Sequence, residues 1–388
     1  MTRSVEELAV LARKLDRWMR DEAWPLWWSA GRHENGSFFE ALDFSGQAAS
    51  NPIARVRVQA RQIYSFALAL DLGWHQDELP VGLSLSLEWF RDICLGPEGI
   101  PGVLVDLEAA RMTDPQPNLY VTAFTLLAFA QANQVIGGAE YDDHITQLLD
   151  NVDRHLAHEG GDGYRETLPE GPLRLQNPHM HFYESLLCLY ETTGAPKVAQ
   201  RADRLLSFIR RTFFDDSAGV VAEEAGAASP VPASWYEPGH SLEWVWLLGR
   251  RARLLDVPLD PFAVRLYEHY CSSGFPEGET PMRLTVNHEP IDPSCRLWSQ
   301  TEALKAHLCI AELGPDRLAS SALDRAVACA ASIHDRWLDT ECRGGFYDQF
   351  DAEGKLMSKN IPGSMGYHLY VASVELTRTV NRLTKKEP

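Results

Sequence analysis

The sequence lacks the motifs that mark the common metal, nucleotide and nucleophile sites. Its seven cysteines are odd in number and scattered, with no Cys-x-x-Cys pair, which argues against a disulfide framework and a structural zinc site. A Gly-x-Ser-x-Gly elbow is absent, and so is a Gly-rich phosphate loop. The pair Gly344 and Gly345 precedes an expected hairpin rather than a helix, so a nucleotide is not indicated.

Positive charge and long apolar runs are also scarce. The 36 Lys and Arg residues face 54 Asp and Glu residues, for a formal net charge of -18, so most of the surface would repel nucleic acid. A neutral or weakly charged small molecule is the more compatible ligand. The apolar runs are too short to span a bilayer, and residues 1–8 lack the apolar core of a signal peptide. We therefore expect a cytoplasmic protein that binds no membrane.

The chain does contain a repeat. Six similar segments recur at intervals of 59 to 66 residues, and each runs from a polar or ionisable residue, or in one case a tyrosine, into an aromatic and aliphatic helical stretch. Such a period indicates a supersecondary unit that needs its neighbours, and about sixty residues accommodate two helices. Six helical hairpins predict a closed ring or an open solenoid. The ring is favoured because it would bring the six leading residues to one cavity. These residues are Arg61, Tyr120, His181, Glu243, Glu302 and His368.

Helical periodicity predicts helices through most of the chain. A few short strands are expected in the loops, at 163–166, at 283–286 and in a hairpin at 344–355, and 222–238 is expected to be loop. No linker is evident, so a single domain over residues 1–388 is predicted. The expected helices cover 5–28, 55–72, 83–94, 118–133, 142–158, 178–193, 195–214, 240–255, 261–271, 296–313, 320–338 and 368–382.

Histidines with a carboxylate three residues on are the strongest candidates for chemistry. His240 and Glu243 share one helix face, as do His181 and Glu184. A histidine whose ring nitrogen is held by a carboxylate is oriented and more basic, which suits a general base near neutral pH. His368 opens the last repeat. A histidine at a helix start is often only a cap or a surface residue, but these three fall at the same phase of different repeats.

Other chemistries remain open at these residues. Neither His181 nor His240 has a second histidine four residues on, as the zinc-protease motif requires, although three histidines from separate repeats could still converge on a metal. Asn177 would share a face with His181. Arg61 could stabilise a developing enediolate oxygen, or form a salt bridge with Glu302.

At these residues the chain resembles the N-acylglucosamine 2-epimerase superfamily, which includes mannose isomerases, sulfoquinovose isomerases and cellobiose 2-epimerases. The similarity runs in family order through nearly the whole chain, although Ser364 stands where some relatives carry glutamine. It implies an all-α fold, a single (α/α)6 barrel of six helical hairpins with a few short β-hairpins in the loops. It also implies a monomeric or homodimeric sugar isomerase or epimerase without a metal or another cofactor. The matching motifs are VQARQIY (58–64), QNPHMH (176–181), PGHSLEWVWLL (238–248), LWSQTEA (297–303), GGFYDQFDAEGK (344–355) and YH (367–368).

The resemblance also implies roles for individual residues. In that family two histidines face each other across the sugar, and His240 and His368 occupy those positions here. The Trp298-to-Glu302 spacing is most similar to the mannose isomerase branch. Tyr120 and Trp298 would offer flat faces to sugar C–H surfaces, or belong to the core. The residues matching those that bind the open-chain sugar or orient the histidines are Arg61, Asn177, His181, Glu243 and Glu302.

The implied reaction is proton transfer next to a carbonyl. His368 would take the C2 proton of mannose and leave a cis-enediolate. Return of the proton to C1, with His240 relaying a proton between O1 and O2, gives fructose. Reprotonation of C2 by His240 from the opposite face gives the C2 epimer instead. We therefore expect a mannose–fructose isomerase, active also on lyxose and related sugars, with a 2-epimerase as the alternative. A glycoside hydrolase would need two inward carboxylates, such as Glu243 and Glu302, and would leave the histidines idle. A sugar-binding scaffold would tolerate their loss.

Overall fold

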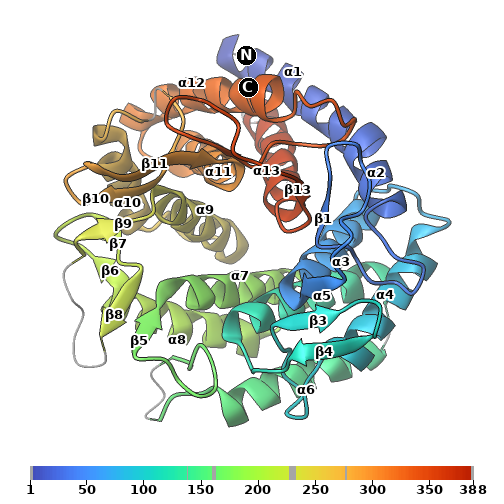
Figure 1. Ribbon diagram of the computed structural model, residues 1–388. Coiled ribbons are helices and arrows are strands. Elements are labelled where there is room, and N and C mark those ends of the chain that lie inside the picture. The colour runs from blue at the N-terminus through green and yellow to red at the C-terminus, as the bar shows by residue number, and fades with distance from the viewer. Residues whose placement is uncertain (1–2, 138, 160–162, 227–232, 276–277, 386–388) are drawn as a thin grey trace.

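The inner layer of the fold is a closed ring of helices. The computed structural model describes residues 3–137, 139–159, 163–226, 233–275 and 278–385. Each inner helix packs against the next, and α13 packs back against α3, so the expected ring is confirmed and the open solenoid is wrong (Figure 1). The inner helices are α3 (Val56–Asp71), α5 (Leu119–Ile136), α7 (Gln176–Thr193), α9 (Pro238–Leu255), α11 (Leu297–Leu313) and α13 (Gly366–Lys385).

A second layer of helices surrounds the ring, which confirms the all-α (α/α)6 barrel. The first helix, α1, packs against α13 and α12, so the two ends of the chain together complete the sixth hairpin. A π-helical turn at Met19–Ala23 joins α1 to α2 (Trp24–Ser29), and another at Ile333–Trp337 follows α12. The outer helices are α1 (Arg3–Trp18), α4 (Leu79–Cys94), α6 (Ala139–His155), α8 (Pro196–Phe213), α10 (Pro261–Ser272) and α12 (Asp316–Ser332).

The two layers differ in the pattern of their apolar residues. Almost every residue of α5 from Leu119 to Ala132 is buried, whereas α8 buries one stripe that includes Leu205 and Ile209. A helix that is apolar all round belongs in the core of a large fold, and an amphipathic helix covers it. By length and composition α5 could also cross a membrane, but 72% of its apolar window is buried inside the protein. Its place in the inner ring accounts for its composition.

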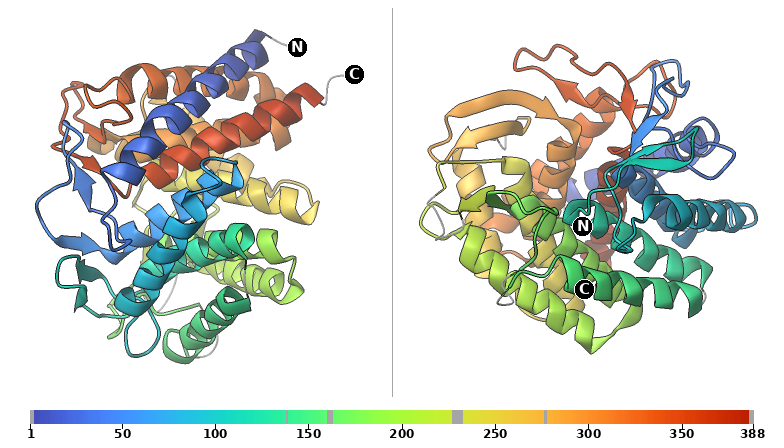
Figure 2. Two further views of the ribbon diagram at one scale, coloured as in Figure 1. Left: turned by 90° about the vertical axis from the view of Figure 1, so that its right-hand side faces the viewer. Right: turned by 60° about the horizontal axis from the view of Figure 1, so that its bottom comes forward.

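Short antiparallel strands lie at one end of the barrel (Figure 2). Some of them precede inner helices: β2 (Ile53–Arg55) precedes α3, β5 (Leu173–Leu175) precedes α7, β9 (Trp235–Tyr236) precedes α9, β11 (Pro290–Arg296) precedes α11 and, after a short turn, β13 (Ile361–Pro362) precedes α13. Strand pairing therefore fixes the N-terminal ends of these helices. The other strands of these sheets are β1 (Ala41–Leu42), β3 (Leu104–Asp106), β4 (Arg111–Asp114), β8 (Glu224–Gly226), β10 (Pro281–Thr285) and β12 (Gln349–Phe350). A separate pair is formed by β6 (Phe214–Asp215) and β7 (Val220–Val221).

The expected loop strands are confirmed only in part. The strand near 283–286 is β10. The hairpin at 344–355 has its turn where expected, but β12 pairs mainly with β11. The strand expected at 163–166 is wrong, because Tyr164 makes only a single bridge, with Ala157. The loop expected at 222–238 contains β8 and β9, while 227–232 lie outside the described residues.

Gly249 marks a close approach between α9 and α11. A Cβ at this position would lie 2.2 Å from Cys309 Sγ, and Cys309 is buried. We expect Gly249→Ala to lower the free energy of unfolding by about 1–3 kcal/mol, because overpacking outweighs the better helix propensity of alanine. Thermal unfolding measures this. Gly171→Ala, where a Cβ would meet nothing within 4 Å, should leave the melting temperature unchanged. An unchanged melting temperature for Gly249→Ala would show that the two helices move apart at little cost.

Candidate active site

The sequence-predicted residues meet in a cavity of about 430 Å³ at the N-terminal ends of the inner helices. This volume is typical of small-molecule sites. Every inner helix contributes at least one side chain to the lining. Glu302 alone among the predicted residues lies behind the wall, fully buried against His368. The predicted residues in the lining are Arg61, Tyr120, Asn177, His181, His240, Glu243, Trp298 and His368.

The His368 ring is held by Glu302, which forms a buried ion pair with Lys305. Its Nδ1 lies 2.9 Å from Glu302 Oε1, and the other carboxyl oxygen of Glu302 lies 2.7 Å from Lys305 Nζ. The ammonium of Lys305 also sits 3.6 Å from the centre of the Trp246 ring. With Nδ1–H donating to Glu302, Nε2 of His368 is the unprotonated nitrogen. Lys305 was not predicted from the sequence.

His240 is held by a loop carboxylate, not by Glu243. Its Nδ1 lies 2.8 Å from Glu223 Oε2 and 3.5 Å from Glu237 Oε2. Glu223 is fixed in turn, because it accepts hydrogen bonds from the backbone N–H of Glu237 and from the Gln176 side chain. The prediction that the three-residue spacing would pair His240 with Glu243 is therefore wrong. Glu223 is a site residue that the sequence did not single out.

The second His–Glu pair does form. His181 Nδ1 lies 2.9 Å from Glu184 Oε2, and the Tyr367 hydroxyl donates to the other oxygen of Glu184. Burial lowers the pKa of His181 to about 4 in spite of Glu184. The ring is therefore neutral at pH 7. His181 packs edge-on against Tyr120, with ring centres 5.2 Å apart.

Glu243 is a buried carboxyl group that lacks a hydrogen bond to any residue that the structure describes. Neither of its oxygens has a hydrogen-bond partner within the described part of the chain, and the nearest nitrogen of His181 is 3.8 Å from Oε1. Burial, together with the negative charge of Glu302, raises the pKa of Glu243 well above its usual value. Burial and the charge of Glu302 therefore favour the protonated, neutral form of this carboxyl group in the cavity.

The two candidate catalytic histidines carry opposite protonation states. Burial disfavours the charged form of both, but at His240 the carboxylate of Glu223, with other carboxylates behind it, overcomes burial and raises the pKa to about 10. At His368 burial is reinforced by the cations of Arg61 and Lys305, and its pKa falls well below the usual value. At neutral pH the cavity therefore holds an imidazolium acid and a neutral imidazole base.

Arg61 and Trp298 complete the lining around the histidines. Arg61 donates from Nη1 to the Ser364 carbonyl oxygen (3.0 Å) and from Nη2 to the Tyr120 hydroxyl (2.9 Å). The alternative salt bridge with Glu302 is not formed, because Lys305 and His368 occupy that carboxylate. The Trp298 ring lies 5.0 Å from the His240 ring and 6.0 Å from the His368 ring. It offers a flat wall beside both.

Among the residues that the structure describes, two groups of side chains have the atoms to ligate a metal ion. They are His181 with Glu184 and Glu243, and Glu243 with Glu302 and His368, with ligand atoms within 4.8 Å of one another in each group. The histidine nitrogens of both groups already contact carboxylates. In the second group Lys305 would also repel a cation. These groups differ from the three-histidine site that the sequence left open.

Removing the Glu223 carboxylate should lower the pKa of His240. We expect Glu223→Gln to move the His240 pKa from about 10 toward lower pH, because burial then meets less opposition. NMR titration of the His240 ring would measure this. Because the raised pKa keeps the acid protonated up to about pH 10, the alkaline limb of the pH–rate profile should move to lower pH with it. Glu224→Gln is the matched control, because Glu224 lines the same cavity without contacting His240. A His240 pKa that Glu223→Gln leaves unchanged would assign the shift to Glu237.

The chain is similar to known sugar isomerases and epimerases. Residues 36–372 match the family model described as N-acylglucosamine 2-epimerase (GlcNAc 2-epimerase). The mannose-6-phosphate isomerase of Rhizobium meliloti (strain 1021) is 32% identical over 393 residues, covering 97% of this chain and 99% of that protein. The cellobiose 2-epimerase of Spirochaeta thermophila DSM 6192 superposes with a TM-score of 0.87 at 19% identity, covering 99% and 100% of the two chains. A D-mannose isomerase superposes at 0.82 and 20% identity, covering 95% and 97%. At such identities these two structures show the fold.

Proposed function

Since the chain belongs to the N-acylglucosamine 2-epimerase family and is an isomerase or epimerase with a sugar substrate, we propose that it interconverts D-mannose and D-fructose. The observation that carries the proposal is the neutral base His368 and the protonated acid His240, both beside Trp298 in one cavity. An aldose–ketose isomerisation needs both a base for a C–H proton and an acid for the oxygens next to it.

In the proposed reaction His368 is the base. Its Nδ1 is held by Glu302, so Nε2 takes the C2 proton of open-chain mannose. The electrons form a cis-enediolate, and the guanidinium of Arg61 and the imidazolium of His240 stabilise its oxygens. His240 gives its proton to O1 and takes up the proton of the C2 hydroxyl, so that the C2 carbonyl forms as His368 returns its proton to C1, which gives fructose. Asn177 and the neutral carboxyl of Glu243 hold hydroxyl groups of the sugar.

A 2-epimerase is the second candidate, and the charge state of His240 favours it. A protonated imidazole on the far face of the enediolate is the group that would deliver a proton to C2 from the opposite side, turning mannose into glucose. The Rhizobium meliloti relative supports the isomerase instead, because its name gives an aldose–ketose reaction on the mannose skeleton, with phosphate at C6.

Incubation with mannose in D2O, with EDTA present, separates these outcomes. Fructose, with deuterium at C1 to the extent that the proton exchanges with solvent, supports the isomerase. Glucose that forms before fructose and carries deuterium at C2 supports the epimerase. Loss of turnover in EDTA, with recovery on adding a divalent cation, would contradict a reaction carried by the histidines alone. No conversion of mannose, lyxose or mannose 6-phosphate would overturn the proposal.

A further inference from the structure

Gly239 lies directly before His240 in the first turn of α9, where the backbone itself does not require a glycine. It is buried, it is helical, and its φ lies outside the left-handed region that favours glycine. Glycine is a poor helix former, because it loses more backbone freedom on folding than alanine does. The missing side chain is therefore the property of this position that needs a physical reason.

The glycine leaves room for the ring of Trp298. A Cβ at position 239 would lie 2.5 Å from both Cζ3 and Cη2 of Trp298 and 3.1 Å from the Cβ of Ser299. Carbon atoms that are not bonded pack at about 3.5–4.0 Å, so the ring lies directly against the backbone of α9. The same ring lines the catalytic cavity, 5.0 Å from the His240 ring and 6.0 Å from the His368 ring. The contact at Gly239 therefore sets where this wall of the cavity stands.

The first turn of α11, which carries Trp298, is held by buried hydrogen bonds. Ser299 Oγ donates to the carbonyl oxygen of Thr280 (3.2 Å). The Gln300 side chain accepts from the backbone N–H of Thr280 (2.9 Å) and donates to the same carbonyl oxygen (2.9 Å). All three residues are buried, so moving this turn away from α9 would break hydrogen bonds that water cannot readily replace.

The first turn of α9 is also held in place. The backbone N–H of Glu237 donates to Glu223 Oε1 (3.0 Å), and His240 Nδ1 lies 2.8 Å from the other oxygen of Glu223. Because both helix starts are held, the Trp298 side chain is the part that can yield by rotation. A side chain at position 239 would therefore push the ring away from α9.

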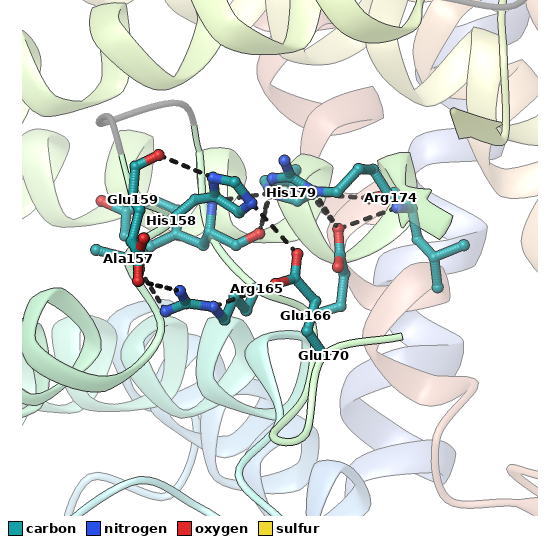
Figure 3. Close-up of polar contacts among 10 residues, drawn as sticks. Ala157, His158, Glu159, Arg165, Glu166, Glu170, Arg174 and His179 are labelled. Atoms are coloured by element: carbon teal, nitrogen blue, oxygen red, sulfur yellow. Dashed lines mark hydrogen bonds and ion pairs between the residues drawn. The ribbon is translucent and has the colours of Figure 1, made fainter. Parts of the chain in front are cut away.

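The start of the neighbouring inner helix, α7, is held by polar contacts. Glu166 accepts hydrogen bonds from the backbone N–H of Leu175 (3.0 Å) and from Arg174 (3.4 Å), and His179 Nδ1 lies 2.8 Å from the carbonyl oxygen of Leu175. Figure 3 shows Glu166 beside Arg174 in this network. Polar groups can regain a contact through water after a small shift, whereas two carbon atoms 2.5 Å apart must separate. One added methyl group at the start of α9 should therefore alter the cavity.

We propose that Gly239 is a positioning residue of the active site, because its missing side chain lets the Trp298 ring stand against α9 beside His240 and His368. This inference rests on the proposed function and adds a residue to that site. Gly239 acts through the Trp298 ring, against which the sugar would be held. Proton transfer from carbon requires close alignment, and a misplacement of about 1 Å can lower the rate about a hundredfold.

Gly239→Ala is expected to lower kcat about ten- to a hundredfold. Gly82→Ala is the matched control, because a Cβ there would lie 2.4 Å from Cζ2 of Trp28, in the outer helix α4, and Trp28 does not line the catalytic cavity. Both variants should lower the melting temperature, but Gly82→Ala should keep kcat within a few-fold of native. A native kcat in Gly239→Ala, or an equal loss in both variants, would overturn the proposal.

A double variant shows whether the effect passes through Trp298. Phenylalanine at position 298 lacks the outer ring carbons Cζ3 and Cη2, so it removes the crowding that alanine at position 239 creates. In the Trp298→Phe background, Gly239→Ala should therefore lower kcat little further, and the protein should fold even if Gly239→Ala alone does not. If the two substitutions lower kcat by the product of their separate effects, Gly239 does not act through the ring and the proposal is wrong.

NMR of the histidine rings separates this proposal from the proposed function, because it needs no turnover. An aromatic ring shifts the resonances of protons close to it, so Gly239→Ala should shift the ring resonances of His240 and His368 in the protein without sugar. Gly82→Ala should leave them in place. Shifted resonances support the positioning contact even if no sugar is converted. Unchanged resonances would overturn it even if the native protein converts mannose to fructose.

Discussion

Replacing His368 with asparagine is expected to lower kcat about 10²–10⁴-fold while sugar binding persists. His240 is protonated, and we assign the base role to His368 rather than to the equally neutral His181 because His368 and His240 both lie beside Trp298. Asparagine can retain a hydrogen bond to Glu302 but cannot accept a proton from carbon. The measurement is kcat with mannose or its preferred derivative, together with calorimetric affinity for a non-isomerisable hexitol.

His179→Asn is the matched control for this variant. His179 is equally buried, and burial lowers its pKa to about 4, but it lies against Leu175 and Tyr164 outside the cavity. We expect it to cost stability and to leave kcat within a few-fold. If His368→Asn kept a tenth of native kcat, the base would lie elsewhere. Loss of turnover with binding intact would also exclude a scaffold that only binds sugar.

The barrel could be predicted from the sequence because similar segments, one in each inner helix, recur at intervals of 59 to 66 residues. Each leading residue lies near the mouth of the barrel, since every inner helix must begin there for the chain to return through an outer helix. Strand-to-helix transitions keep that register, so Arg61, His181 and His368 reach one cavity. Helix starts were less predictable: α4 begins at Leu79 and α12 at Asp316, each four residues before the expected start.

The histidine partners were predictable only where the helix geometry is local. His181 lies well inside α7, so Glu184 on the same face can reach it. His240 lies in the first turn of α9, and side chains lean toward the N-terminus of their helix, so its ring meets the loop carboxylate Glu223. Glu243, one turn deeper, projects into the barrel axis. Because Glu223 lies in a loop and meets the start of α9 only in the folded structure, no spacing in the sequence could have predicted this contact.

Lys305 left a weaker signal in the sequence. It is a lysine in an apolar helix, three residues after Glu302, and that spacing could have predicted the ion pair.

Lys305→Met is expected to reduce kcat about 10- to 100-fold, as loss of a group that orients a catalytic ligand commonly does. Lys305 and Glu302 are both fully buried, with Nζ and Oε2 2.7 Å apart. Burial already raises the pKa of Glu302 to about 7 against the opposing effect of Lys305. Without the ammonium this pKa rises further, and a protonated Glu302 is a weaker acceptor for the Nδ1–H of His368 and can instead donate its own O–H to the ring nitrogen. The base then loses its tautomer and its orientation.

The pH dependence of this variant has a defined sign. Turnover needs Glu302 ionised and His368 neutral, and Lys305 lowers the pKa of both. Its removal should therefore move the acid limb of the pH–rate profile to higher pH. The free energy of unfolding of the variant should respond to pH in the opposite direction to its turnover. The folded state holds a proton on Glu302 that the unfolded state releases above its ordinary pKa of about 4.5, so the free energy of unfolding falls as pH rises above that value.

A double variant separates the role of Lys305 in positioning from its role in stability. Leaving Glu302 buried without its cation should cost about 3–5 kcal/mol, whereas Lys305→Met with Glu302→Gln removes both charges and should restore most of that loss. If Lys305 acts by holding Glu302 against His368, the double variant recovers stability but not kcat. Recovery of both would show that the ion pair only supports the barrel. A Lys305→Met enzyme with native kcat and an unmoved acid limb would show that His368 keeps its tautomer without the ion pair.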